Sequence, residues 1–193
     1  MTFAKTISKE EIAEMPREVF PGRIVVVDTK EGLTEALSRL SSFAEVGFDT
    51  ETRPNFTKGS NYKMSLIQLS SEDLCFLIRL NKFRRFPAGL ETFLKNNTVK
   101  KIGLALRDDF HQLNRLTNVS PNNFIDLQQY VLSFGIEETS LRKIYAILFG
   151  KRISKHQQRS NWDVQQLREP QMYYAALDAW ACLRIYQYLE QFK

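Results

Sequence analysis

The chain has 193 residues, of which 43% are hydrophobic and 25% are charged, so its length and composition suit one soluble globular domain with a sizeable core. No apolar run approaches the ~20 residues of a membrane span, and the N-terminal segment lacks the uninterrupted apolar core of a secretory signal. The two cysteines have no metal-ligand spacing and give no disulfide framework, which predicts a reducing, cytoplasmic location.

The chain begins with a predicted arm, residues 1–22, that carries a short helix near 9–15. The rest of the chain, 23–193, contains runs of β-forming residues and segments with apolar residues at helical spacing. In chain order these patterns predict a strand at 23–28, a helix at 31–43, strands at 44–51, 64–70 and 74–78, a helix at 87–96, a strand at 99–106, a helix at 108–117, a strand at 123–127, and helices at 140–149 and 169–191. This order predicts a single α/β domain with a mixed β-sheet flanked by α-helices.

One segment of the chain is strongly basic. Residues 139–162 contain no Asp or Glu, although several Lys and Arg side chains occur there. Together with a net charge of +5 and a pI near 9.2, this distribution favours a polyanionic partner. A solvated helix face followed by a loop explains the same composition without any ligand.

A pair of acids ends the run AEVGFDTE at 44–51. In a strand, Asp49 and Glu51 project from one face and Thr50 projects from the other. Two neighbouring carboxylates raise each other's pKa, and a divalent cation that prefers oxygen ligands, Mg²⁺ or Mn²⁺, relieves their repulsion. A single Asp-x-Glu also arises by chance in a chain of this composition, so the pair alone can be structural.

Two adjacent acids, Asp108 and Asp109, stand where the strand at 99–106 gives way to the helix at 108–117. Acids are favoured at a helix N-terminus by side-chain capping and by the helix macrodipole. One of the two can therefore cap the helix while the other points into a site.

The last predicted helix carries a carboxylate on its apolar face. At about 100° per residue, Asp178 falls on the same apolar stripe as Tyr174, Leu177, Ala181 and Phe192. An isolated buried carboxylate is strongly unfavourable unless another group pairs with it. Tyr174, one turn earlier, or Arg184 can supply a hydrogen bond, and a bound cation can offset the charge.

Together these acids can form one site. Carboxylates from a strand end, a helix start and a helix face can converge on two cations ~4 Å apart, the usual arrangement for in-line displacement at phosphorus. A tyrosine beside them can orient the attacking water or help to deprotonate it. His111 and His156 lack the partners of a metal site or a nucleophilic triad, so we expect them at the surface or in loops.

The order of these motifs resembles the DEDD superfamily of exonucleases. Asp49-Thr-Glu51, Asp109 in IGLALRDDFHQL and Tyr174-x-x-x-Asp178 are similar to its three motifs, and the tyrosine corresponds to the DEDDy branch. The segment SNWDVQQLREPQMYYAALDAWACLRIY resembles the last stretch of the exonuclease domains of ribonuclease D and of the Werner syndrome helicase. The likeness extends over nearly the whole chain.

This resemblance implies a ribonuclease H-like fold and a metal-dependent 3′→5′ exonuclease that releases 5′-mononucleotides by a two-metal mechanism. It implies that Asp49, Glu51 and Asp178 hold the cation that activates water, and that Asp49 and Asp109 act on a second cation. Tyr174 is implied to position the attacking water, and Glu51 to approach the terminal 3′-hydroxyl.

The chain departs from the family pattern at two positions. Asp108 stands where a small or varied residue is usual, and Asp109 is preferred as the ligand because it keeps the family's spacing from Gly103 and to Leu113. Arg168 replaces the commoner helix-capping Thr or Ser before the last helix, which should affect helix stability more than chemistry.

The resemblance also implies a single-stranded or 3′-ended DNA or RNA as partner, and no organic cofactor. Basic side chains before the last helix are candidates to hold its phosphates: Lys151, Arg152, Lys155 and Arg159. Three side chains of the loop at 52–63 are candidates to touch the terminal nucleotides: Arg53, Phe56 and Lys58. A solvent-exposed loop explains these three equally well, and Trp162 either stacks on a base or packs in the core.

Two other interpretations stay open. A non-catalytic nucleic-acid-binding module with the same fold would bind single strands without releasing nucleotides in Mn²⁺. A structural protein would use the same acids as helix caps and surface charges. DNA and RNA both remain candidate substrates, because discrimination depends on contacts to the 2′-hydroxyl.

Overall fold

The computed structural model describes residues 2–53 and 64–193, and within them the chain forms a mixed six-stranded sheet. Its strands are β1 (Arg23–Val27), β2 (Glu45–Thr52), β3 (Met64–Ser70), β4 (Leu74–Arg79), β5 (Lys100–Gly103) and β6 (Phe124–Asp126). Their order across the sheet is β1-β4-β3-β2-β5-β6, and β3 runs antiparallel to its two neighbours. The remaining pairs are parallel, so the carboxyl ends of the other strands lie along one edge.

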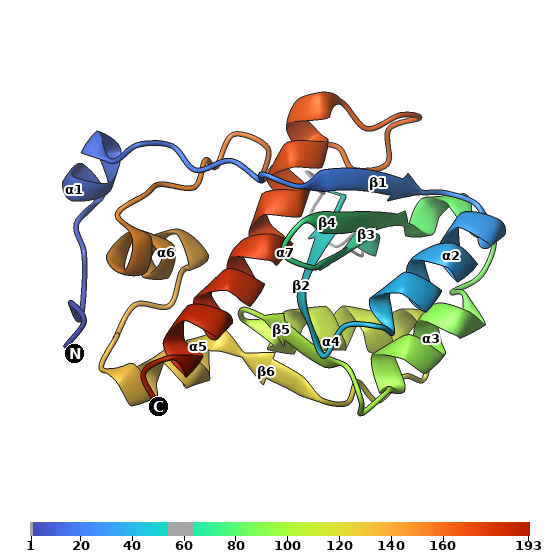
Figure 1. Cartoon of the computed structure of the whole chain (residues 1–193). Coiled ribbons are helices and arrows are strands. Elements are labelled where there is room, and N and C mark those ends of the chain that lie inside the picture. Colours follow the sequence, from blue (N-terminus) through green and yellow to red (C-terminus); the bar gives the residue numbers. More distant parts are fainter. Residues whose placement is uncertain (1, 54–63) are drawn as a thin grey trace.

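Helices cover both faces of this sheet, as Figure 1 shows. Their bounds are α1 (Lys9–Glu14), α2 (Lys30–Leu40), α3 (Ala88–Lys95), α4 (Leu106–Leu116), α5 (Leu127–Tyr130), α6 (Leu141–Phe149) and α7 (Glu169–Glu190), with single 3₁₀ turns η1 (Leu80–Lys82) and η2 (Val131–Phe134). One hydrophobic cluster joins α2, α3 and α4 to the sheet, and a second joins α5, α6 and α7 to the opposite face. This arrangement confirms the predicted α/β fold class.

The predicted elements are present, and their boundaries differ by up to three residues, at the end of α2 and around the start of α4. The helix predicted at 108–117 begins at Leu106, and the strand before it ends at Gly103. Ala105 between them is left-handed, with φ 57°, and Asp126 accepts hydrogen bonds from the backbone N–H groups of Ala105 and Leu106. Asp126 thus supplies the cap that the sequence analysis assigned to one of the two acids inside the helix.

Helix α7 crosses one face of the sheet and is buried on almost every side, not only along the predicted stripe. Phe192, which the helical spacing predicts on the buried face, follows the end of the helix and is exposed. A glycine allows the closest approach: a Cβ on Gly47 of β2 would stand 1.9 Å from the carbonyl oxygen of Ala179. The backbone of β2 therefore contacts the backbone of α7 at Gly47, two residues before Asp49.

The N-terminal arm packs on α6 and α7 through a buried carboxylate. Glu18 accepts a 2.7 Å hydrogen bond from the Tyr145 hydroxyl and forms ion pairs of 3.1 Å with Lys151 and Arg184. The backbone N–H of Glu18 also donates to the carbonyl of Arg152 at 2.9 Å. These contacts fix the segment that follows α6 to the arm.

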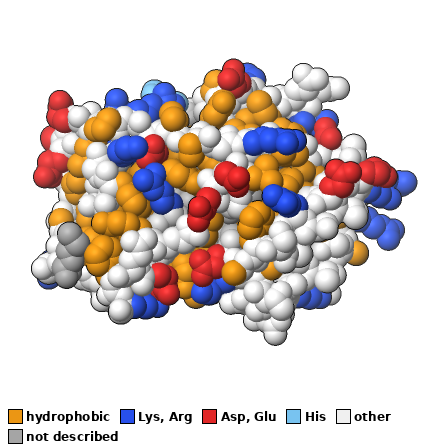
Figure 2. Space-filling model, viewed as in Figure 1, with side chains coloured by type: hydrophobic (Ala, Val, Ile, Leu, Met, Phe, Trp, Pro, Cys, Tyr) orange, Lys and Arg blue, Asp and Glu red, His pale blue; other side chains and the backbone are white. Residues whose placement is uncertain are grey.

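On the face shown in Figure 2, acidic side chains (red) and basic side chains (blue) are interspersed. In the part of the chain that the structure describes, no helix has both the length and the apolar character that a bilayer crossing requires. Cys75 and Cys182 are both buried and unpaired.

Candidate active site

Three carboxylates meet where β2 ends beneath α7. Asp49 and Glu51 alternate along β2 and therefore point to the same face, the face that α7 covers. Asp178 comes from α7, next to the residue whose backbone touches Gly47. One carboxylate oxygen from each of the three lies within 4.8 Å of the other two. The structure thus brings together three of the four predicted acids, and we call Asp49, Glu51 and Asp178 the carboxylate cluster.

Burial and mutual repulsion make these acids hard to ionise. Burial raises the pKa of Asp49 well above its usual value, and the charge of Asp178 raises it further. The pKa of Glu51 is raised in the same way, by burial and then by the charge of Asp49. Burial raises the pKa of Asp178 to about 7, although a hydrogen bond with Tyr174 and the charge of Arg142 oppose the shift.

The donor set of the cluster fits a divalent cation. Glu51 and Asp178 are 9% and 8% exposed, and Asp49 is half-buried, so the charges are largely shielded from water. Among the residues described, the Oδ1 atom of Asp178 has no hydrogen-bond partner. Hard carboxylate oxygens in this number are ligands that Mg²⁺ or Mn²⁺ accepts, and a cation would offset the buried negative charge.

Tyr174 stands one helical turn before the third carboxylate and is held by the segment that precedes α7. Its ring lies 6.2 Å from that of Trp162, which is 1% exposed and therefore packs in the core. The buried Gln171 side chain accepts from the backbone N–H of Arg168 and donates to the carbonyl of Asn161, both at 3.1 Å. Gln171 thus caps the start of α7, where the sequence analysis noted a missing Thr or Ser, and ties Trp162's segment to the helix.

The fourth predicted acid, Asp109, is not one of the three whose oxygens lie within 4.8 Å of one another. Thr50 projects from the opposite face of β2, and its hydroxyl donates a hydrogen bond to Asp109. Burial raises the pKa of Asp109 to about 6, and the Thr50 hydrogen bond opposes that shift. The charge of Asp109 still contributes to the raised pKa of Asp49, so the two acids interact through space.

The cluster opens into a cavity of about 400 Å³. Arg142 lines it, and a 2.7 Å hydrogen bond from its Nε to the Ile153 carbonyl holds the guanidinium in place. Arg142 belongs to the basic stretch at 139–162, but its role could not be predicted, because a single arginine at a helix start has no distinguishing pattern. The remaining wall residues have no role predicted from the sequence: Leu104, Ala105, Gln128, Thr139, Ser140, Leu141, Ser154, Gln158 and Cys182.

The basic side chains predicted to hold phosphates fall in different surroundings. Lys155 is exposed and lines the cavity. Lys151 pairs with Glu18, and the Nε of Arg152 donates to the Met15 carbonyl at 2.9 Å, so both contact the arm. Arg159 is exposed and does not line the cavity.

The loop after β2 was predicted to reach the terminal nucleotides. Arg53 is exposed and lies 3.8 Å from Asp163, in the segment before α7. Phe56 and Lys58 lie outside the described residues. A nucleotide-contacting role for these three side chains stays a prediction.

The raised pKa values predict an unusual pH dependence of stability in the absence of divalent cations. In the unfolded chain an aspartate titrates near pH 4, whereas the folded pKa of Asp178 is about 7. Because the folded state then binds more protons, the free energy of unfolding in EDTA should fall as the pH rises from 5 to 8. The Asp178 contribution should be on the order of 2 kcal/mol.

Urea unfolding at a series of pH values checks this expectation. Mn²⁺ should reduce the loss of stability at pH 8. In EDTA, the free energy of unfolding of Asp178→Asn should depend less on pH than that of the native protein. If the free energy of unfolding depended on pH equally in the native protein and in this variant, the buried charge could not be assigned to Asp178.

Comparisons with known proteins agree with this geometry. A family model described as 3′-5′ exonuclease matches residues 24–192. The bifunctional 3′-5′ exonuclease/ATP-dependent helicase WRN of Mus musculus is 35% identical over 184 residues, covering 91% of this chain and 13% of that protein. The crystal structure of the Nibbler EXO domain of Aedes aegypti superimposes with a TM-score of 0.77 at 27% identity, covering 97% of this chain and 92% of that chain.

The same fold occurs in the exoribonuclease RNase D of Escherichia coli, with a TM-score of 0.78 and 22% identity, covering 88% of this chain and 44% of that one. The chain therefore spans a small part of the mouse protein and under half of RNase D, but nearly all of the Nibbler EXO domain. The predicted resemblance is confirmed over almost the full length of the sequence. This chain belongs to the 3′-5′ exonuclease family.

Proposed function

We propose that residues 23–193, with residues 1–22 as a packed arm, form a metal-dependent exonuclease that removes nucleotides from the 3′ end of a nucleic acid and releases 5′-mononucleotides. The carboxylate cluster carries this proposal, because its three oxygens lie within 4.8 Å in a cavity beside a tyrosine. Ordinary helix caps and surface charges would have no reason to converge in this way. The simple structural interpretation of the acids is therefore less well supported.

Asp49, Glu51 and Asp178 would hold one divalent cation, Mg²⁺ or Mn²⁺. Asp49 would also contact a second cation, on which Asp109 would act either directly or through water. When bound, the two cations supply an activated water and stabilise negative charge on the leaving oxygen. No organic cofactor is needed for this hydrolysis.

Tyr174 would orient the attacking water as a neutral hydrogen-bond donor or acceptor. Burial raises the pKa of its hydroxyl above the ordinary value, and the charge of Asp178 raises it further. The phenol is therefore protonated near neutral pH, which favours a positioning role over that of a general base. Its contact with Trp162 and the adjacent cap by Gln171 hold the ring in place.

The substrate would be a single-stranded or 3′-ended DNA or RNA. Arg142 and Lys155 line the cavity and are placed to meet the phosphates, with Arg53, Phe56, Lys58 and Arg159 as further candidates. Lys151 and Arg152 would act indirectly, since they fix the segment that carries Lys155. A cytoplasmic location remains part of the proposal, on the basis of cysteine use.

Degradation of 5′-labelled single strands of DNA and of the matching RNA tests the proposal. With Mn²⁺ or Mg²⁺ the native protein should give a ladder that shortens from the 3′ end, and EDTA should abolish it. Chromatography of the released product should show 5′-mononucleotides. Well-folded protein that binds either strand but cleaves neither in any metal would favour the non-catalytic binding module.

A further inference from the structure

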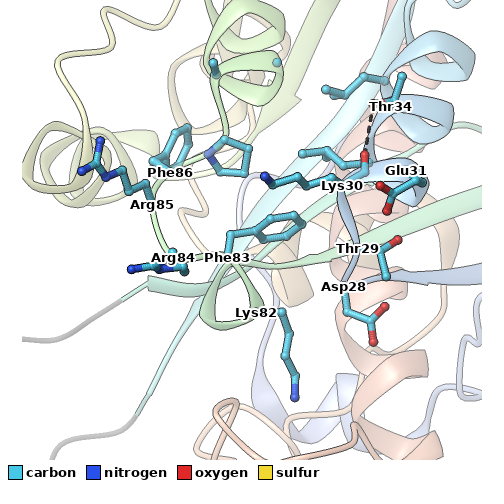
Figure 3. Close-up of a pocket in the computed structure, with 15 residues that line it drawn as sticks. Asp28, Thr29, Lys30, Glu31, Thr34, Lys82, Phe83, Arg84, Arg85 and Phe86 are labelled. Atoms are coloured by element: carbon cyan, nitrogen blue, oxygen red, sulfur yellow. Dashed lines mark hydrogen bonds between the residues drawn. The ribbon is translucent and has the colours of Figure 1, made fainter.

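A second cavity, of about 870 Å³, lies at the end of the sheet formed by the carboxyl ends of β1 and β4. The start of α2 forms one wall, and the loop from Lys82 to Pro87 forms the other. Figure 3 shows Arg84 and Arg85 extending from this loop to the same side, while the Phe83 ring lies between the loop and Lys30. No sequence motif described above includes any of these residues.

Most of the charged residues that line this cavity are cationic. It includes the side chains of Lys30, Lys82, Arg84 and Arg85, all of which are exposed. None of the four forms an ion pair with another residue in the described ranges 2–53 and 64–193. Two acids, Asp28 and Glu31, lie on the α2 side. Cations thus outnumber acids, and those on the loop are unneutralised.

Aromatic rings alternate with these cations along the loop sequence Lys-Phe-Arg-Arg-Phe. Phe83 and Phe86 are half-buried and pack against the hydrophobic cluster beneath α2 and α3, so each ring is anchored while part of it stays accessible. Anchored rings beside free guanidinium groups are the surface that single-stranded nucleic acid recognises, by stacking of bases and by contacts to phosphates.

The sheet register places the end of β4, which leads into this loop, at the same edge of the sheet as the candidate active site, although the loop packs on the α2 and α3 face and the carboxylate cluster lies on the α7 face. Glu51 of β2 is opposite Leu66 of β3, and Leu66 is opposite Arg79 of β4. Glu51 and Arg79 are therefore two strand spacings apart, a distance of about 10 Å within the sheet. The buried Arg79 donates hydrogen bonds to the carbonyls of Val164 and Gln165, so it fixes the end of β4 to the segment before α7.

We propose that Lys82, Arg84 and Arg85, with the rings of Phe83 and Phe86, form a second contact surface for the strand whose 3′ end lies in the carboxylate cluster. This inference rests on the proposed function for the polarity of the strand. Phosphates follow one another at intervals of about 3.4 Å or more, so a strand leaving the site reaches the start of the loop within a few nucleotides. The surface binds the nucleotides that precede the scissile bond, and its affinity depends on strand length.

The experiment compares Lys82→Ala/Arg84→Ala/Arg85→Ala with a control variant of equal charge change, Lys9→Ala/Arg39→Ala/Arg115→Ala, whose residues are also exposed. Fluorescence anisotropy in EDTA measures binding of a labelled twelve-nucleotide strand over a salt series. The loop variant should bind about tenfold more weakly, and the slope of log K against log salt should fall by about 2, since each phosphate contact contributes about 0.7. The control should retain the native affinity and slope.

A second readout uses catalysis in Mn²⁺. The loop variant should hydrolyse a dinucleotide at the native rate and lose activity only on the longer strand. The proposal would be overturned if the loop variant kept the native affinity for the strand and the native salt dependence, or if the control variant lost as much affinity. Tighter binding of polyglutamate than of the strand by the native protein would also overturn it. Failure of the native protein to cleave either substrate would instead refute the proposed function, while the anisotropy comparison would still decide on the loop.

Discussion

Asp49→Asn should abolish hydrolysis while leaving the folded protein as stable as the native one in EDTA, or more stable. The carboxylate is crowded by Asp178 and Glu51, and burial raises its pKa, so the neutral amide removes repulsion from the folded state. The same amide binds a divalent cation far less well than a carboxylate does. We expect the rate of nucleotide release to fall about a thousandfold or more, and Mn²⁺ to lose most of its stabilising effect.

Asp108→Asn is the matched control, because Asp108 is an exposed acid of the first turn of α4. Its activity and its response to Mn²⁺ should stay close to those of the native protein. Tyr174→Phe provides a contrast, since it should slow hydrolysis but retain the stabilisation by Mn²⁺. Retention of activity by Asp49→Asn would remove the basis for placing a cation at the cluster.

Gly47→Ala should destabilise the protein more than any other change of a single methyl group that we consider. The added Cβ would stand 1.9 Å from the Ala179 carbonyl oxygen and 2.7 Å from its carbonyl carbon, and backbone atoms cannot rotate away as a side chain can. Helix α7 must move off β2, so the loss in the free energy of unfolding should be about 3 kcal/mol, at the upper end of the usual range for an added methyl group in a packed core. The same shift carries Asp178 away from Asp49, and Mn²⁺ should stabilise the variant less than the native protein.

Gly89→Ala separates this effect from that of any added methyl group. Gly89 lies in the first turn of α3, and its Cβ would meet only a side-chain carbon of Leu37, at 3.2 Å. Alanine is favoured over glycine in a helix, so the free energy of unfolding should change by less than about 1 kcal/mol. Urea unfolding of both variants checks the comparison, and a similar loss in the two would show that the contact of α7 with β2 is not a tight one.

The cluster was predictable from the sequence because its residues obey local periodicities. Alternation along a strand places Asp49 and Glu51 on one face, and a spacing of four residues places Tyr174 and Asp178 on one side of a helix. The hydrophobic patterns on either side of these motifs give the strand and the helix that carry them. The resemblance to a known family added the pairing between the two elements, which no local pattern contains.

Contacts between distant segments account for the features that the sequence did not reveal. Lys151 and Arg152 lie in a basic stretch, and only the folded arm shows that they contact Glu18 and the Met15 carbonyl. The turns from 127 to 134 have too few residues to display a helical period. The hydrogen bond from Thr50 on β2 to Asp109 on α4 joins the sheet to a helix, and its formation depends on where α4 begins.

The position of α7 after every strand in the chain has a consequence for protein synthesis. The ribosome releases β2 long before α7, so a nascent chain carries two carboxylates of the cluster and lacks both the third and the tyrosine. Docking of α7 also closes the hydrophobic cluster on that face of the sheet. The carboxylate cluster is therefore incomplete until α7 has been synthesised and has docked on the sheet, because Asp178 and Tyr174 reach the site only with that helix.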